Sequence, residues 1–258
     1  MKIYNFKQHE LGADQEQSIQ NAIENWGIMT HAERIAFIDS INVHTNPDWL
    51  EVRAAKFTAS TASEFLTDPS TKAAKEAGEI GESAKSLCYR VMAEMAGWRE
   101  SQNPYMEFAS IRRGLIFEST ARKLAEQELG ETITECGFVE SDSMFGCSPD
   151  GLILDGDKVK AVIEIKCPEP KAFYKQIMDC AKKEYQAQMQ FSMAVCDCPR
   201  AYFVLYCPEV SQKVFILKYT RGIAWQNKIQ ERKKQVAEFI SSVYNQVNQG
   251  EFNIPTAE

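Results

Sequence analysis

Residues 148–166 read SPDGLILDGDKVKAVIEIK, and this segment specifies the centre of the predicted structure. Two apolar runs flank the pair Asp155-Gly156, and an Asp-Gly pair between such runs is the strongest short-range signal for a β-hairpin, because the turn needs residues at positive φ. Side chains alternate along a strand, so Glu164 and Lys166 leave the same face. Asp150, at the head of the first strand, can approach that face across the hairpin.

Two carboxylates beside a lysine form the group that metal-assisted phosphodiester hydrolysis requires. Mg²⁺ takes oxygen ligands and keeps several waters, which suits Asp150 and Glu164. A bound cation polarises a phosphate and lowers the pKa of a water that Lys166 can orient or deprotonate. An Asp…Glu-x-Lys pattern by itself is more often an exposed hairpin with a surface ion pair. The surrounding residues must therefore decide between these two interpretations.

Length and composition predict one sizeable globular domain. The chain has 258 residues with 44% hydrophobic and 25% charged side chains. These fractions are ordinary for a globular protein, and no apolar run approaches the ~20 residues of a membrane span. The first residues, Met1-Lys2-Ile3-Tyr4, lack the apolar core of a signal peptide, so we expect a cytoplasmic protein without a membrane partner. The net charge of −7 argues against a protein that coats nucleic acid, but not against an enzyme with a local basic channel.

The eight cysteines are predicted to be reduced thiols that pack as small hydrophobes. The alternative is a soft-metal or iron–sulfur site at Cys196, Cys198 and Cys207, although the Cys-x-Cys spacing is tighter than zinc sites usually use. All three histidines precede the hairpin, so we do not expect histidine catalysis there.

Periodicity divides the chain into three parts. Residues 1–45 carry two accessory helices within residues 14–42, the second capped by Thr30 with Glu33 closing a capping box. Residues 46–220 form the core, and residues 221–258 form a helix packed on it. Within the core we expect helices at about 83–96, 106–130 and 184–196, strands at 137–140, 201–206 and 214–217 besides the hairpin, and a surface loop at 67–78. This order predicts an α/β fold, with a mixed β-sheet flanked by helices.

Glu118 is a further candidate on the predicted helix that ends at Gly130. It lies among the apolar residues Leu115, Phe117 and Ala121, where an acid is costly unless it is paired or metal-bound. Arg122 follows four residues later and offers a plain helical salt bridge as the alternative.

A second set of residues, upstream of the hairpin, suits a phosphate. Thr58-Ala59-Ser60 leads into a helix start, and the unpaired N–H groups of a helix N-terminus suit a phosphate. Arg53 can add a bidentate contact. An N-cap serine and a surface arginine explain the same residues without any ligand.

Several of these signals stand in one order along the chain. They are Arg53 with residues 58–60, Arg113-Gly114-x-x-x-Glu118, and the segments 146–152, 164–168 and 185–193. From about Trp49 to Tyr206, this order closely resembles the lambda exonuclease and YqaJ-type viral recombinase (alkaline exonuclease) family. That family belongs to the PD-(D/E)xK restriction-endonuclease-like superfamily, so the resemblance implies a restriction-endonuclease-like core.

The resemblance also implies a metal site. Asp150 and Glu164 match the family's Mg²⁺ ligands, with the backbone carbonyl of Ile165 beside them. Glu118 matches the helix carboxylate that completes the site, directly or through water. The implied cofactor is Mg²⁺, as two ions that Mn²⁺ can replace.

The remaining implied roles concern water and the 5′-phosphate. Lys166 resembles the residue that activates the attacking water, and Gln188 resembles the helix glutamine that positions the lysine, the nucleophile or the scissile strand. Arg53, Ser60 and Ser148 resemble a pocket for a 5′-phosphate.

The activity implied is Mg²⁺-dependent 5′→3′ digestion of double-stranded DNA from linear ends, which leaves a 3′ overhang for phage-type recombination by strand annealing. The implied partners are duplex ends, a single-strand annealing protein and two further copies in a homotrimer, with a phage or prophage protein acting in the cytoplasm of a bacterial host. Alternatives are a structure- or site-specific endonuclease with the same core, an inactive DNA-binding module, and an iron–sulfur nuclease.

Overall fold

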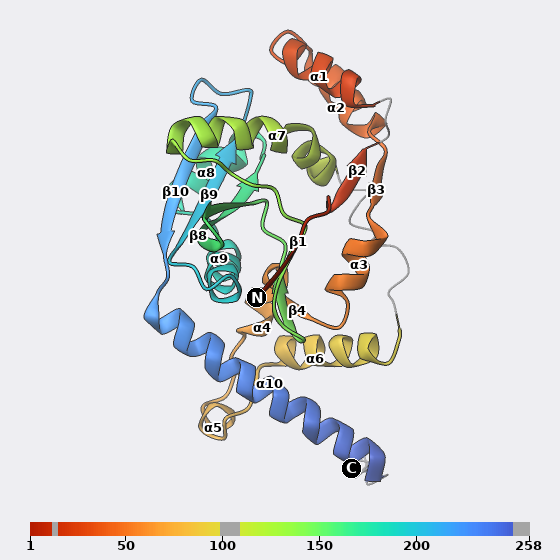
Figure 1. The fold of residues 1–258 in the computed structure, drawn as a ribbon, viewed down its shortest axis with the longest axis vertical. Coiled ribbons are helices and arrows are strands. Elements are labelled where there is room, and N and C mark those ends of the chain that lie inside the picture. Colours follow the sequence, from red (N-terminus) through yellow and green to blue (C-terminus); the bar gives the residue numbers. More distant parts are fainter. Residues whose placement is uncertain (12–14, 99–108, 250–258) are drawn as a thin grey trace.

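The computed structural model describes residues 1–11, 15–98 and 109–249 (Figure 1). Its strands form two four-stranded sheets and one two-stranded sheet, with helices packed around them. The predicted class, a mixed α/β fold with helices flanking mixed sheets, is confirmed. The prediction of one sheet is wrong, because the described residues divide their strands among three.

The central sheet has the order β10-β9-β8-β7, in which β8 and β9 are parallel and the other neighbours antiparallel. Its strands are β7 (Gly151–Asp155), β8 (Lys158–Lys166), β9 (Arg200–Tyr206) and β10 (Val214–Thr220). The predicted hairpin is confirmed as β7–β8.

The hairpin turn lies one residue later than predicted. Asp155 pairs with Lys158 across the strands, so the two turn residues are Gly156 and Asp157. Gly156 takes the first of them with a φ of 58°, which a residue without Cβ adopts at no steric cost.

Alternation along the central strands separates two cores. Val162 of β8 and Phe203 of β9 pack with Phe191 of α9 (Lys183–Val195). Ile163, their neighbour on β8, packs with Phe117 of α7 (Ala109–Leu129). Because side chains alternate, α7 and α9 cover opposite faces of this sheet.

The second sheet has the order β1-β5-β6-β4 and lies beside the first. It consists of β1 (Lys2–Tyr4), β5 (Phe138–Asp142), β6 (Phe145–Cys147) and β4 (Phe57–Thr58), with β4 and β6 parallel. β2 (His9–Leu11) and β3 (Val43–Thr45) form the two-stranded sheet. Only β5 was predicted, because strands of two or three residues are too short to show alternation.

The N-terminal helices are confirmed as α1 (Gln15–Asn25) and α2 (His31–Ser40). The capping box of Thr30 and Glu33 is present as predicted. Figure 1 shows this pair at one end of the molecule and α10 (Ile223–Gln249) at the other.

The other helices of the core are only partly as predicted. They are α3 (Pro47–Arg53), α4 (Ala62–Phe65) after a 3-10 turn at Ala59–Thr61, α5 (Lys72–Glu76), α6 (Glu82–Met95) and α8 (Pro170–Met178). Residues 67–78 are therefore not all loop, since they contain α5. The helix α8 was missed because Cys167-Pro168 reads as a stop, although Pro170 occupies the first turn, where proline favours a helix. Residues 106–108 of the predicted 106–130 helix lie outside the described residues.

The C-terminal helix packs on the core through an apolar stripe and an ionic clamp. Ile229, Val236 and Ile240 are buried. Arg232 donates to the carbonyl of Thr67 at 2.6 Å and to Asp68 at 2.9 Å. None of the helices in the described part of the chain is long and apolar enough to cross a membrane.

The eight cysteines are free thiols, and six of them are buried. Cys198 donates to the carbonyl of Arg200 and Cys207 donates to the Glu209 carboxylate, so these two thiols point to separate partners. Among residues 1–11, 15–98 and 109–249, no three His, Cys, Asp or Glu side chains form an arrangement that could hold a metal ion. The structure therefore gives no support to the soft-metal alternative.

A buried ion pair joins α7 to the segment that follows β9. Arg113 contacts both carboxylate oxygens of Glu209, at 3.0 and 2.7 Å. Trp26 of the N-terminal pair also donates to Glu209, at 2.7 Å. Arg113 further donates to the carbonyls of Cys167 and Pro168, at 2.9 and 3.3 Å, and so holds the segment just after β8.

This pair predicts acid sensitivity of the fold. Burial alone raises the pKa of Glu209, but the hydrogen bonds from Arg113 and Trp26 lower it to about 2. A carboxyl group whose pKa is lower in the folded protein than in the unfolded chain stabilises the fold at pH values above its ordinary pKa. This stabilisation disappears as the pH falls from about 4.5 toward 2. Glu209→Gln should therefore lower the free energy of unfolding at pH 7 by about 3 kcal/mol.

Urea unfolding at pH 7 and pH 3 checks this prediction, with the exposed Glu76→Gln as the control. The difference between wild type and Glu209→Gln should shrink at pH 3. An equal difference at both pH values would contradict the assignment of the ion pair.

Candidate active site

The carboxyl end of β8 carries the first group of predicted residues. Alternation places Glu164 and Lys166 on the face that α9 covers, and the Lys166 ammonium donates to Glu164 Oε1 at 2.6 Å. Gln188 of α9 donates to the same oxygen at 2.7 Å. The Glu164 residue is only 5% exposed. The ion pair considered as an alternative thus exists, but it lies between a strand and a helix, with Glu164 buried and Lys166 partly exposed, rather than on an exposed hairpin.

Asp150 joins this group from the head of β7. Its backbone N–H donates to the carbonyl of Ile163 at 3.0 Å, and its Oδ2 accepts from the N–H of Ile165 at 2.6 Å. The side chain therefore ties the start of one strand to the end of the other. Burial raises the pKa of Asp150 well above its ordinary range, and repulsion from Glu164 and Glu118 adds to the shift.

Glu118 reaches the same group from α7. Its carboxylate pairs with Arg122 at 2.5 Å, so the helical salt bridge is present. Arg122 also pairs with Glu135 and donates to the carbonyl of Asp150 at 3.1 Å. Burial raises the pKa of Glu118 despite Arg122. Arg122 thus connects Glu118 to Glu135 and to the backbone of Asp150, whereas the sequence predicted it only as a partner of Glu118.

The group carries an excess of negative charge. The carboxylates are those of Glu118, Asp150 and Glu164, and the cations are Lys166 and Arg122, the latter shared with Glu135. Burial alone lowers the pKa of Lys166, but Glu164 and Asp150 raise it above its ordinary value. Carboxylates close enough to repel one another in a partly buried position favour the binding of a cation.

The chemistry of these donors suits a hard divalent cation. Asp150, Glu164 and Glu118 offer oxygen ligands, the type that Mg²⁺ prefers. Each uses one oxygen in the hydrogen bonds above, and no donor within the described residues reaches the second oxygen of any of them. As the side chains stand, no three acidic, histidine or cysteine residues among the described residues form a group that could hold a metal ion.

A second polar group surrounds Arg53, the last residue of α3. Its guanidinium donates to the Ser60 hydroxyl at 2.6 Å and to the Thr58 hydroxyl at 3.4 Å. Burial lowers the pKa of Arg53 to about 10, and Arg90 contributes to the shift. Arg53 and Ser60 are thus brought together as predicted.

Ser148 belongs to this second group through a residue that the sequence analysis missed. Trp49 donates from its indole N–H to the Ser148 hydroxyl at 2.9 Å, and the Arg53 guanidinium lies 4.7 Å from the centroid of the Trp49 ring. Trp49 and Arg53 are four residues apart on α3, a spacing that places them on one helix face and would have identified the pair had the helix been predicted. Ser148 is two residues from Asp150, so the two groups are neighbours.

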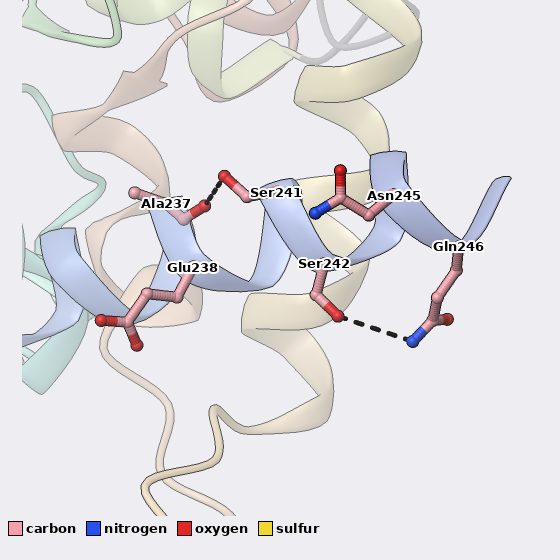
Figure 2. Close-up of a pocket in the computed structure, with 6 residues that line it drawn as sticks. All are labelled: Ala237, Glu238, Ser241, Ser242, Asn245 and Gln246. Carbon is pink, nitrogen blue, oxygen red and sulfur yellow. Dashed lines mark hydrogen bonds between the residues drawn. The ribbon is translucent and has the colours of Figure 1, made fainter. Parts of the chain in front are cut away.

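A hollow on the surface of α10 lies away from both groups. Figure 2 shows it lined by Ala237, Glu238, Ser241, Ser242, Asn245 and Gln246, all from this one helix. None of these six residues carries a predicted role, and their two hydrogen bonds remain within the helix.

Two of the solved structures with a similar fold are described as exonucleases. An alkaline exonuclease from Laribacter hongkongensis matches with a TM-score of 0.60 at 24% identity, over 80% of this chain and 100% of that one. A phage-related exonuclease from Haemophilus somnus matches with a TM-score of 0.60 at 19% identity, over 74% of this chain and 96% of that one. The sequence has no match among curated proteins. At these identities the likeness concerns the fold.

The family comparison is more specific. The model of the YqaJ-like viral recombinase domain matches residues 48–199, which is more than half of the chain. The match includes both polar groups described above, from Trp49 to Gln188. The predicted family is therefore confirmed, and the chain belongs to the YqaJ-like viral recombinase domain family.

Proposed function

We propose that the protein is a Mg²⁺-dependent nuclease that digests linear double-stranded DNA from its 5′ ends and leaves a 3′ overhang. The observation that carries this proposal is the convergence of Asp150, Glu164 and Glu118 with Lys166 and Gln188. These residues come from a hairpin and two helices that cover opposite faces of its sheet. Family membership and the exonuclease descriptions of the similar structures support the same activity.

Asp150, Glu164, the carbonyl of Ile165 and Glu118 would hold the metal, as two Mg²⁺ ions that Mn²⁺ can replace. When bound, the metal would polarise the scissile phosphate and lower the pKa of a water. Arg122 keeps Glu118 in place from the side of α7.

Lys166 orients and activates the attacking water in this proposal. Its ammonium already lies against Glu164, so it stands next to the carboxylates that face the phosphate. Gln188 donates to the same Glu164 oxygen and limits the positions that the carboxylate and the lysine can adopt. Gln188 thus acts as a positioning residue.

The 5′→3′ direction rests on the second polar group. Arg53 and Ser60 supply a forked cation and a hydroxyl, and Ser148 supplies a second hydroxyl. A 5′-phosphate held there lies beside the carboxylates, because Ser148 and Asp150 are two residues apart. The Laribacter exonuclease was also crystallised in complex with dAMP, a mononucleotide, which supports stepwise removal of nucleotides.

The biological setting follows from the family description, viral recombinase. We propose that the 3′ overhang is passed to a single-strand annealing protein in phage-type recombination. The enzyme would act as a homotrimer in the cytoplasm of a bacterial host, encoded by a phage or prophage.

The test of the activity compares linear and closed circular duplexes. With Mg²⁺ present, a linear duplex labelled at its 5′ ends should lose the label early, and the strands that end in 3′ overhangs should remain. Covalently closed circles should stay intact. Cleavage of closed circles would favour an endonuclease and contradict the proposal.

The first prediction concerns the lysine. Lys166→Ala should lower turnover by about 10²–10⁴-fold, because it removes water activation and keeps the carboxylates. Affinity for DNA ends should stay within about tenfold. Lys160→Ala is the matched control, since Lys160 lies on the same strand and pairs with Glu131. Near-normal turnover of Lys166→Ala would show that the lysine is not catalytic.

The second prediction concerns the metal. Ca²⁺ takes more ligands at longer distances than Mg²⁺, so it should support binding to DNA ends and block cleavage. Mobility shifts in Ca²⁺, followed by addition of excess Mg²⁺, separate the two steps: digestion should begin only after Mg²⁺ is added. Efficient digestion in Ca²⁺ alone counts against the proposed metal site.

The third prediction concerns the 5′-phosphate. Charge-assisted hydrogen bonds contribute about 1.5–3 kcal/mol each, so wild type should digest 5′-phosphorylated ends about ten- to a hundredfold faster than 5′-hydroxyl ends. Arg53→Ala should remove most of this preference, and Arg53→Lys should restore only part of it, because lysine lacks the forked geometry. The measurement is the initial rate on duplexes that differ only in that phosphate.

Arg112→Ala is the control, because Arg112 lies on α7 and pairs with Asp39. It should keep the full preference. Equal rates of wild type on both substrates would refute the phosphate pocket and leave the nuclease activity standing.

A further inference from the structure

The exposed face of α8 has an unusual composition for a surface helix. Tyr174 is 58% exposed and Met178 is 81% exposed, and Lys171 and Lys175 lie beside them. The spacing of these four residues places them on one helix face. Phe173, on another face, is buried. Tyr174 and Met178 are therefore exposed to solvent, on a helix that already packs on the core through another apolar residue, Phe173.

This face belongs to a locally basic segment. Residues 170–183, between Glu169 and Glu184, contain four lysines and one aspartate, for a formal charge of 4 − 1 = +3, in a chain whose net charge is −7; Lys175 pairs with Asp179 at 2.7 Å. Lys182 and Lys183 close the segment at the start of α9 and are exposed. We call Lys171, Tyr174, Lys175, Met178, Lys182 and Lys183 the α8–α9 surface. Its charge is complementary to phosphate, and exposed aromatic side chains among lysines are typical of surfaces that bind unpaired bases.

The α8–α9 surface adjoins the catalytic group. The Lys166 ammonium lies 5.5 Å from the centroid of the Tyr185 ring, and the Lys182 ammonium lies 6.0 Å from the same centroid. In addition, α8 begins at Pro170, shortly after Lys166 in the chain. A DNA strand bound at Asp150, Glu164 and Glu118 can therefore continue onto the α8–α9 surface.

A strained turn holds the two helices at this junction. Cys180 and Ala181 are consecutive non-glycine residues with φ of 49° and 65°. Hydrogen bonds from Ala181 N to the Gln176 carbonyl (2.8 Å) and from Gln186 to the Ala181 carbonyl (3.2 Å) stabilise the turn. The Tyr219 hydroxyl also donates to the Cys180 carbonyl. Backbone strain of this kind persists only where the surroundings enforce it, and it concentrates at ligand-binding segments.

We propose that the α8–α9 surface binds single-stranded DNA next to the cleavage site, with lysines on phosphates and Tyr174 and Met178 against unpaired bases. The inference rests on the proposed nuclease function, because it takes the carboxylate group as the point where the strand is cut. A single strand is the occupant, since stacking on Tyr174 requires a base that is free of its partner, whereas an intact duplex offers this surface only its backbone.

Fluorescence anisotropy of a labelled 12-nucleotide single strand and of the matching duplex, in EDTA to prevent cleavage, tests the base contacts. Tyr174→Ala combined with Met178→Ala should weaken single-strand binding about tenfold or more and leave duplex binding within about twofold. Tyr174→Phe should keep the wild-type affinity, because it keeps the ring. Tyr89→Ala, a tyrosine of similar exposure on α6, is the control and should bind as wild type does.

Salt dependence tests the phosphate contacts. Lys182→Gln combined with Lys183→Gln should reduce the slope of log affinity against log salt by about 0.7 per lysine for the single strand. Lys72→Gln combined with Lys75→Gln, on α5, is the matched control and should leave the slope unchanged. Thermal unfolding of each variant shows that the exposed substitutions keep the fold.

Two outcomes overturn the proposal. One is unchanged single-strand affinity and salt slope in all α8–α9 variants, and the other is a larger loss on duplex than on single strand. Hydrolysis of bis(p-nitrophenyl) phosphate, too small to reach α8, should be the same in wild type and all these variants. Absence of any Mg²⁺-dependent hydrolysis by wild type would refute the nuclease function instead. The binding data would still show whether the α8–α9 surface binds single-stranded DNA.

Discussion

Repulsion among three carboxylates at the end of β8 is the constraint on which the rest of the site depends. Asp150, Glu164 and Glu118 lie close enough to affect one another's ionisation, Glu164 in a buried position and the other two in partly buried ones. Such an arrangement is unfavourable unless cations and hydrogen-bond donors compensate it. Each carboxylate accordingly receives a different compensating donor: the N–H of Ile165, the Lys166 ammonium and the Arg122 guanidinium.

The fold supplies these donors from separate elements. The hairpin brings Asp150 against Ile165, α9 brings Gln188 to Glu164, and α7 brings both Glu118 and Arg122. The two helices can do this because they cover opposite faces of the central sheet, and alternation along the strands gives each its own core. Arg113 then fixes α7 to two segments, through Glu209 to the one that follows β9 and through the carbonyls of Cys167 and Pro168 to the one that follows Lys166. The strand β8 is thus held at its end as well as along its length.

The second polar group, around Arg53, was predicted from the sequence only in part. Arg53 and Ser60 were predicted as neighbours and do contact each other. Their link to Ser148 passes through Trp49, which no motif singled out. A single tryptophan is indistinguishable from a core residue by pattern, and α3 itself was not predicted. Only the folded chain shows that its indole N–H points to the residue that precedes Pro149.

The sequence by itself determined the elements whose signal is local. The hairpin, the flanking helices, the capping box and the family followed from alternation, helical spacing and motifs, each of which spans a short stretch of chain. Tertiary structure decided what depends on distant residues. The division into two main sheets rests on strands too short to show a pattern. The helix α8 was not predicted because Pro168 reads as the end of an element, whereas Pro170 begins the helix. The partners of Glu209 and Ser148 are contacts that arise only when elements far apart in sequence pack together, because the energy of a buried charge or hydroxyl depends on its surroundings in space.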